Sequence, residues 1–126
     1  MNKLHLKQSF AAEILDDILL TNSAGEHVFI SKSDNCVTID KVKVKYPLTI
    51  RLVENGDVFI PYGMKGKKLV NDYLTDTKCS LLEKRSQMVV TDSEGQIVWL
   101  IGKRIDNRFR VTEQTTQVLQ MALINS

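Results

Sequence analysis

The spacing of apolar side chains changes along this chain. Between Phe10 and Leu19, apolar residues recur every three to four positions, which predicts a helix with Ser9 as a candidate cap. Residues 21–26 then form a polar turn. Residues 18–20 are also compatible with the start of a strand.

From His27 onward the period is two, which predicts short strands separated by polar turns. The alternation is strictest at residues 41–45, where Val42 and Val44 are expected to face a core and the lysines to face water or a partner. The predicted strands are residues 27–31, 37–40, 48–53, 58–60, 87–91, 97–101 and 117–124.

Helical spacing returns at residues 67–74, and residues 78–86 are either irregular or a short helix. Short strands with one or two helices predict an α+β fold of compact mixed or antiparallel sheets. The chain length of 126 residues suits one domain, or one domain with an N-terminal attachment. We therefore expect a preceding or linker region at residues 1–45, with a helix and strands, and a domain at residues 46–126.

Composition narrows the class of protein. Hydrophobic residues make up 43% and charged residues 25%, as in soluble globular proteins. Cys36 and Cys79 lack metal-ligand spacing, and with only two histidines we expect free thiols and no metal site. No apolar stretch approaches the roughly 18 residues of a membrane span, so we expect a cytoplasmic protein without membrane contact.

The charge is small but unevenly distributed. Residues 1–60 carry seven Lys/Arg and eight Asp/Glu, whereas residues 61–126 carry ten and seven. All ten of those cations lie between Lys65 and Arg110. The basic half of the chain is therefore the place to look for an anionic partner.

The glycine loop, residues 63–68, reads Gly-Met-Lys-Gly-Lys-Lys. Glycines allow close approach of a backbone to phosphate, and a helix starting at Lys67 would direct free N–H groups at an anion. The spacing is not that of a nucleotide P-loop, which needs a longer gap and a hydroxyl after the lysine. The alternative is a glycine turn with solvated lysines.

The arginine block, residues 103–110, contains Lys103, Arg104, Arg108 and Arg110. Arginines can clamp phosphates, but cations also protect an exposed strand edge. Tyr62, Tyr73 and Trp99 are candidates for stacking on bases, although Trp99 sits in a predicted strand and suits a core. No combination of residues indicates a catalytic triad or another catalytic site.

Residues 51–116 resemble the C-terminal domain of bacterial tRNA(Ile)-lysidine synthetases in the order and spacing of their motifs. The matching residues are Arg51, Gly56-Asp57-Val58-Phe59, Pro61, Gly63 through Leu69, Asp72, Asp76, Lys78, Arg85, Ile97-Val98-Trp99, Gly102 through Ile105 and Arg108 through Thr112. The chain departs from the family pattern at Val58, Leu74 and Cys79, so no role is carried over to those positions.

The resemblance implies an enzyme that joins lysine to the wobble cytidine of tRNA(Ile) with ATP. Its ATP and Mg²⁺ site would lie in an N-terminal domain with a Ser-Gly-Gly-x-Asp-Ser signature, and no Ser-Gly-Gly string occurs here. We therefore expect a non-catalytic fragment without a cofactor of its own. The resemblance also implies a fold shared with a module of the phenylalanyl-tRNA synthetase β subunit.

The implied partners are tRNA(Ile) and the catalytic domain of the same enzyme. Double-helical RNA is recognised mostly through phosphates and 2′-hydroxyls, so cations without catalytic groups suit this role. The alternative is a structural or homodimeric module with an exposed strand edge at residues 42–45. The predicted tRNA contacts are Lys65, Lys67, Lys68, Lys78, Arg85, Arg104, Arg108 and Arg110.

Overall fold

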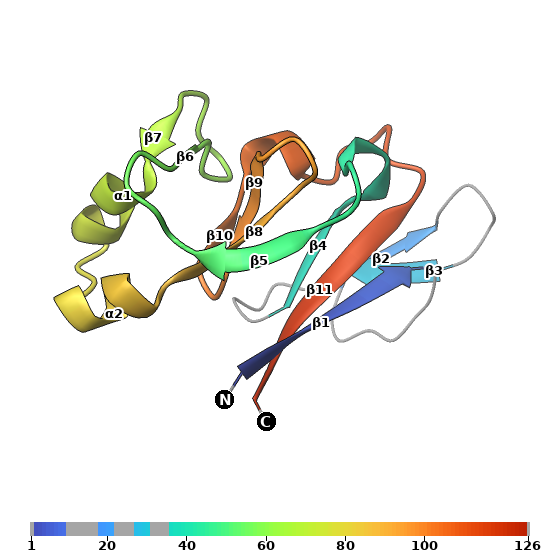
Figure 1. The fold of residues 1–126 in the computed structure, drawn as a ribbon. Coiled ribbons are helices and arrows are strands. Elements are labelled where there is room, and N and C mark those ends of the chain that lie inside the picture. Colours follow the sequence, from blue (N-terminus) through green and yellow to red (C-terminus); the bar gives the residue numbers. More distant parts are fainter. Residues whose placement is uncertain (1, 10–17, 22–26, 31–35, 126) are drawn as a thin grey trace. The chain divides into compact units, whose positions relative to one another are not determined.

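The computed structural model describes residues 2–9, 18–21, 27–30 and 36–125 (Figure 1). By its contacts the chain forms two compact units, residues 1–44 with 109–126 and residues 45–108. The sequence placed residues 109–126 with the second part of the chain, whereas here they pack with the first. The reason is the pairing of the last strand with strands from the N-terminal segment.

The first unit contains a three-stranded antiparallel sheet in the order β1 (Asn2–Ser9), β11 (Val118–Asn125), β4 (Cys36–Asp40). Figure 1 shows β11 between its two partners. A separate hairpin joins β2 (Ile18–Thr21) to β3 (His27–Ile30).

The helix predicted near the N-terminus does not extend over residues 18–21, which form β2 instead. The rest of that predicted helix, residues 10–17, and most of the predicted polar turn, residues 22–26, lie outside the described residues. The predicted strands at 27–31 and 37–40 are confirmed as β3 and β4. They pair with β2 and β11, respectively, and not with each other.

The alternating segment after β4 is not a strand. The carboxylate of Asp40 accepts a hydrogen bond from the amide of Val42 at 3.0 Å and turns the chain into a 3-10 helix, η1 (Lys41–Lys43). Val44 is buried as expected, but Val42 is 68% exposed. A local side-chain cap therefore overrides the period-two pattern.

The second unit is built on a four-stranded antiparallel sheet in the order β10 (Arg104–Ile105), β9 (Ile97–Leu100), β8 (Met88–Thr91), β5 (Thr49–Leu52). A short pair, β6 (Val58–Phe59) and β7 (Lys68–Leu69), completes the strands. The α+β fold with antiparallel sheets and short helices is thereby confirmed.

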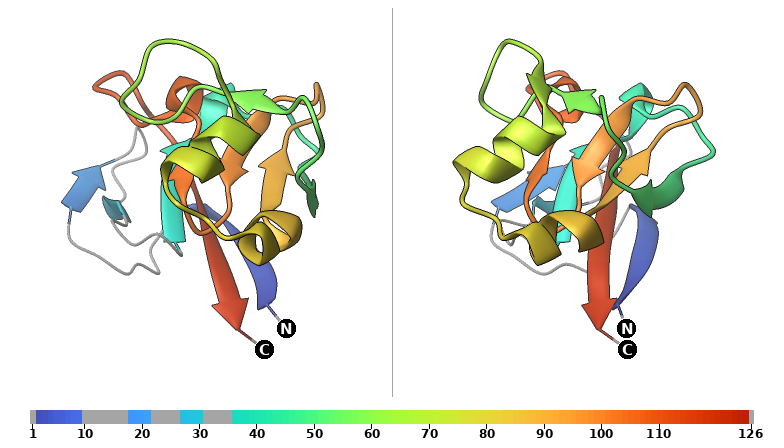
Figure 2. Two further views of the ribbon diagram at one scale, coloured as in Figure 1. Left: turned by 90° about the vertical axis from the view of Figure 1, so that its left-hand side faces the viewer. Right: turned by 60° about the vertical axis from the view of Figure 1, so that its left-hand side comes forward.

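Two short helices follow β7. Helix α1 (Val70–Asp76) packs Val70, Tyr73 and Leu74 into a core with β6, β8 and β9. The left view of Figure 2 looks onto this helix. Helix α2 (Leu81–Ser86) buries no residue and is started by a capping box between Ser80 and Glu83.

The predicted helix at 67–74 begins three residues late. Lys68 pairs with Phe59 in the β6–β7 ladder, and the amide of Val70 donates to the carbonyl of Asp57 at 2.9 Å. Long-range pairing thus takes the residues that would have formed the first helical turn. The expectation that Lys67 opens a helix and offers its amides to an anion is wrong.

Candidate nucleic-acid interface

A tight turn at residues 61–64 leads into the glycine loop. The amide of Met64 donates to the carbonyl of Pro61 at 2.9 Å, and Gly63 has a φ of 89°. A positive φ at the third position of such a turn favours glycine, which carries no Cβ. The turn leaves Tyr62 52% exposed and Met64 42% exposed.

Hydrogen bonds fasten the turn, and Ile60 just before it, to the arginine block. The amide of Tyr62 donates to the carbonyl of Ile105 at 3.0 Å, and the amide of Gly63 donates to Oδ1 of Asn107 at 3.1 Å. The amide of Asn107 donates back to the carbonyl of Ile60 at 2.6 Å. Two basic segments that lie about 40 residues apart in the sequence are thereby joined within the second unit.

Asp106 organises this junction from inside the protein. Its fully buried carboxylate accepts from the amides of Ile60 at 2.9 Å and Arg108 at 2.8 Å. The Arg108 guanidinium donates from Nε at 3.0 Å and from Nη2 at 2.9 Å. A buried carboxylate needs such partners, and the charge of the Arg108 guanidinium is largely compensated by the carboxylate of Asp106.

The same contact raises the pKa of Arg108, through the hydrogen bond to Asp106 and the charge of that carboxylate. The Arg108 side chain remains 35% exposed. The main role of Arg108 is therefore structural, as the partner of Asp106. Asp106 itself is a residue that the sequence analysis missed. The signal was a single acid among cations, two positions before an arginine.

Arg104 is placed between the turn and α1. Its Nη1 donates to the carbonyl of Tyr62 at 3.4 Å, and its guanidinium carbon lies 5.8 Å from the centre of the Tyr73 ring. A cation over an aromatic ring is held by the ring quadrupole. Arg104 is exposed and has no acidic partner among the described residues.

The three lysines of the glycine loop differ in their surroundings. Lys65 and Lys67 are exposed and make no ion pair or hydrogen bond with the part of the chain that the structure describes. Lys68 pairs with Asp76 of α1, and this hydrogen bond raises the pKa of its ammonium group. Lys65 and Lys67 are therefore the better placed of the three for an external anion.

Lys78 and Arg85 are exposed cations near the helices, and their side chains have no ion-pair or hydrogen-bond partner among the described residues. Lys78 follows the end of α1 with a φ of 63°, a left-handed conformation that few non-glycine residues adopt. The amide of Cys79 donates to the carbonyl of Leu74 at 2.9 Å, which closes the helix end.

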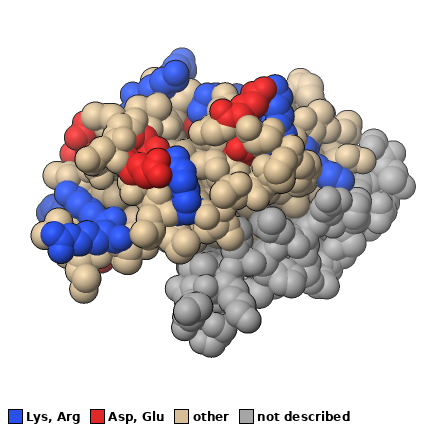
Figure 3. All heavy atoms as spheres, in the orientation of Figure 1, with Lys and Arg blue, Asp and Glu red and all other residues tan. Residues whose placement is uncertain are grey.

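Arg110 belongs to the first unit and is exposed. On the face seen in Figure 3, Lys and Arg atoms form separate groups, with Asp and Glu atoms among them. The structure thus joins the glycine loop to Arg104 and Arg108, and the joint use of all eight predicted contacts stays a prediction.

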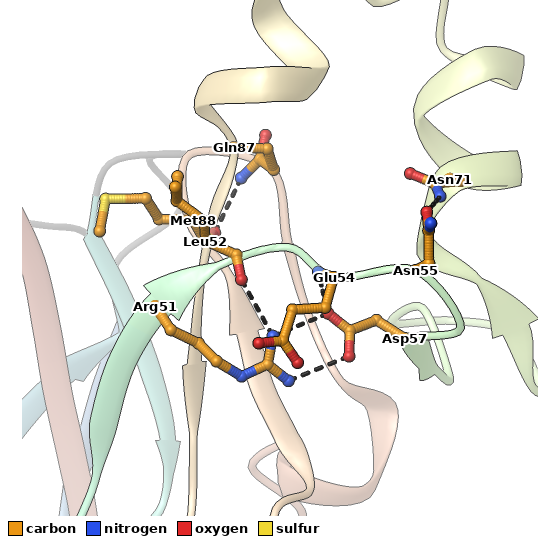
Figure 4. A network of polar contacts seen from close by, with 8 residues as sticks. All are labelled: Arg51, Leu52, Glu54, Asn55, Asp57, Asn71, Gln87 and Met88. Carbon is orange, nitrogen blue, oxygen red and sulfur yellow. Dashed lines mark hydrogen bonds and ion pairs between the residues drawn. The ribbon is translucent and has the colours of Figure 1, made fainter.

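A second polar network lies at the turn between β5 and β6 (Figure 4). Arg51 grips Asp57 with two parallel hydrogen bonds of 2.8 and 3.0 Å, and the amide of Glu54 donates to Asp57 at 2.8 Å. Burial opposes ionisation of Asp57, yet the hydrogen bonds from Arg51 and Glu54 hold the pKa of its carboxyl below its usual value. The carbonyl of Asp57 accepts from Val70, so this network also fixes the start of α1.

Other chemistry is not indicated in the described part of the chain. No group of three or more His, Cys, Asp or Glu residues is arranged there to hold a metal ion. Cys36 and Cys79 form no disulfide within that part of the chain. Trp99 is fully buried, which confirms its place in the core and excludes it as a stacking surface. Among the described helices, none combines the length and apolar character that crossing a membrane requires.

Two solved structures share the fold of this chain. The structure matches the crystal structure of a TILS C-terminal domain with a TM-score of 0.66 and 19% identity, over 98% of this chain and all of the other. It also matches an N-terminal fragment of the phenylalanyl-tRNA synthetase β-subunit from Pyrococcus horikoshii, with a TM-score of 0.61, 21% identity, and coverage of 70% and 27% of the two chains.

Sequence comparison points to one enzyme family. The chain is 43% identical over 90 residues to the tRNA(Ile)-lysidine synthases of Parabacteroides distasonis and Bacteroides thetaiotaomicron, which is 71% of this chain. It is 42% identical over 66 residues to the enzyme of Bacillus subtilis. The chain spans about a fifth of the first two relatives, at 20% and 21% of their length. A scan of family models gave no match. The resemblance to the C-terminal domain of tRNA(Ile)-lysidine synthases is confirmed.

Proposed function

We propose that this chain holds tRNA(Ile) for a tRNA(Ile)-lysidine synthase in the cytoplasm. In this proposal ATP, Mg²⁺ and the reacting groups belong to a catalytic domain of the same enzyme, and this chain contributes only contacts to the tRNA. The observation that carries the proposal is the fastening of the turn at residues 61–64 to the arginine block, which sets Arg104 beside the glycine loop.

The chemistry of the free cations suits a ribose-phosphate backbone. Exposed lysines act as mobile point charges, and Arg104, held on the Tyr73 ring with one N–H on the carbonyl of Tyr62, has further planar donors for a phosphate. Such groups neutralise phosphates without reading bases, which matches recognition of a helical stem by shape. Among the eight predicted contacts, those whose side chains make no ion pair with an acid of the described residues are Lys65, Lys67, Lys78, Arg85 and Arg104.

The salt dependence of tRNA(Ile) binding tests this proposal. Five phosphate contacts predict a slope of log K against log salt of about −4.5. Replacing both Lys65 and Lys67 by methionine is expected to reduce the magnitude of that slope by about two. The matched control is Lys45→Met, because Lys45 already pairs with Glu94 at 3.0 Å. A wild-type affinity that ignores salt, or a double variant with an unchanged slope, contradicts the proposal.

A structural role is the second candidate function. The predicted edge at residues 42–45 is wrong, but β5 ends the sheet of the second unit and leaves Ile50 and Leu52 exposed by 40% and 53%. An apolar edge strand can pair with a second copy of the chain. Ultracentrifugation with and without tRNA separates the two candidates, since a dimer indifferent to tRNA favours the structural role.

A further inference from the structure

Tyr62 presents an aromatic ring on a stretch of backbone that is fixed by hydrogen bonds. Its amide donates to Ile105 and its carbonyl accepts from Arg104, while the next amide, of Gly63, donates to Asn107. The side chain is nevertheless 52% exposed, and its phenol makes no hydrogen bond to the described residues. The protein thus orders the residue through its main chain and leaves the ring uncovered.

The neighbours of Tyr62 match the chemistry of a nucleic-acid strand. Met64 adds a second exposed apolar side chain on the same turn, and Lys65 and Lys67 follow it with unpaired charges. An aromatic face beside cations is the arrangement that binds unpaired nucleotides, because the ring takes the base and the cations take the phosphates. A base inside a stem is already stacked on both faces and gains nothing from such a ring.

We propose that Tyr62 is a stacking platform for an unpaired base of the bound RNA, with Lys65 and Lys67 on the adjoining phosphates. This inference rests on the proposed function and adds a substrate feature to it: a single-stranded nucleotide next to a stem. The other aromatic residues of this region do not offer the same surface. Trp99 is fully buried, and Tyr73 is 9% exposed with Arg104 over its ring.

A cycle of two changes tests the stacking directly. The protein change is Tyr62→Ala in the whole chain, and the RNA change replaces the bases of a single-stranded 3′ tail by abasic sites, which keeps the phosphates. The probe is an RNA hairpin with a tail of about four nucleotides. Tyr62→Ala is expected to weaken binding of the hairpin with bases by roughly 5- to 100-fold and to leave binding of the abasic hairpin unchanged.

Two controls make the result specific to the ring. Tyr62→Trp keeps an aromatic face and is expected to retain wild-type binding. Leu82→Ala removes a 77% exposed apolar side chain on α2 and is expected to change neither affinity. Equal effects of Tyr62→Ala on both hairpins, or no effect on either, overturn the inference. If binding then still falls with salt, the proposed function stands; if the salt dependence is also flat, both fail.

Discussion

The Arg108 guanidinium and the Asp106 carboxylate lie two residues apart and face each other, with Nε at 3.0 Å from one carboxylate oxygen and Nη2 at 2.9 Å from the other. Asp106 is fully buried, and its oxygens also receive the amides of Ile60 and Arg108. An arginine chosen from the sequence as a phosphate ligand is therefore also a structural residue. Loss of its side chain would leave a buried charge with two amide donors.

Replacing Arg108 by methionine is expected to lower the free energy of unfolding by about 2 to 4 kcal/mol, because Asp106 loses its neutralising partner inside the protein. Urea denaturation followed by circular dichroism measures the change. Lys67→Met serves as the control and should stay within about 0.5 kcal/mol of wild type, since Lys67 has no partner among the described residues. Equal stability of the two variants would refute the structural role of Arg108.

Replacing Lys78 by glycine is expected to improve stability while it weakens RNA binding. Lys78 has a φ of 63°, and a left-handed residue with a Cβ costs about 1 kcal/mol relative to glycine. Lys78→Ala keeps the strained backbone and removes the charged side chain beyond Cβ. Both variants should lose the same RNA affinity, and glycine alone should raise the urea midpoint. A Lys78→Gly protein with unchanged affinity would show that the side chain does not contact RNA.

The two glycines of the glycine loop should respond differently to alanine. Gly63 has a φ of 89° and Gly66 has no positive φ, while open space surrounds both. Gly63→Ala is therefore expected to cost about 1 kcal/mol through backbone strain alone. Gly66→Ala should be neutral or slightly stabilising, because it reduces the freedom of the unfolded chain. Thermal unfolding of the two variants compares them, and a larger loss for Gly66 would contradict the assigned turn.

The Arg51–Asp57 pair should make the free energy of unfolding depend on pH in the acidic range. The pKa of Asp57 is lowered in the folded protein, against a value of about 3.9 in the unfolded chain. Its stabilising contribution is thus complete above that unfolded pKa and is lost as pH falls through the folded pKa, while Arg51 stays charged throughout.

The free energy of unfolding of the wild type is therefore expected to exceed that of Asp57→Asn by about 1 to 2 kcal/mol near neutral pH, with the difference shrinking as the pH falls below about 4. Unfolding by urea across that range measures it. Glu113→Gln, at an exposed site outside this network, is the control and should follow wild type. A difference between wild type and Asp57→Asn that is constant with pH would contradict the role of this pair.

Much of the second unit could be predicted from local pattern. Trp99 lies in the core strand that its apolar neighbours indicate, and β9 occupies residues 97–100 of the predicted strand at 97–101. The start of α1 could not be predicted, because Lys68 pairs with Phe59 in the β6–β7 ladder. That pairing depends on the tertiary fold and leaves no signal in the local spacing. Local spacing therefore identifies elements and does not settle competition between a helix and a distant strand.

The candidate site divides in the same way. The cations of the glycine loop and the arginine block are visible in the sequence, and so is the resemblance that links them to tRNA. What sequence could not supply is the partner of each cation: Lys68 with Asp76 and Arg108 with Asp106 are pairs created by folding. Only the structure shows that Lys68 and Arg108 form ion pairs within the protein, whereas Lys65 and Lys67 form none with the described residues.

The pairing of β4 with β11 makes the second unit an insertion between two neighbouring strands of one sheet. Asp40 is opposite Val118, and the amide of Lys41 donates to the carbonyl of Gln117 at 3.0 Å, so the chain departs from and returns to nearly the same point. Insertions between such fixed ends disturb the host sheet little. Changes in the length or sequence of residues 45–108 can therefore accumulate during evolution while the pairing of β4 with β11 is kept.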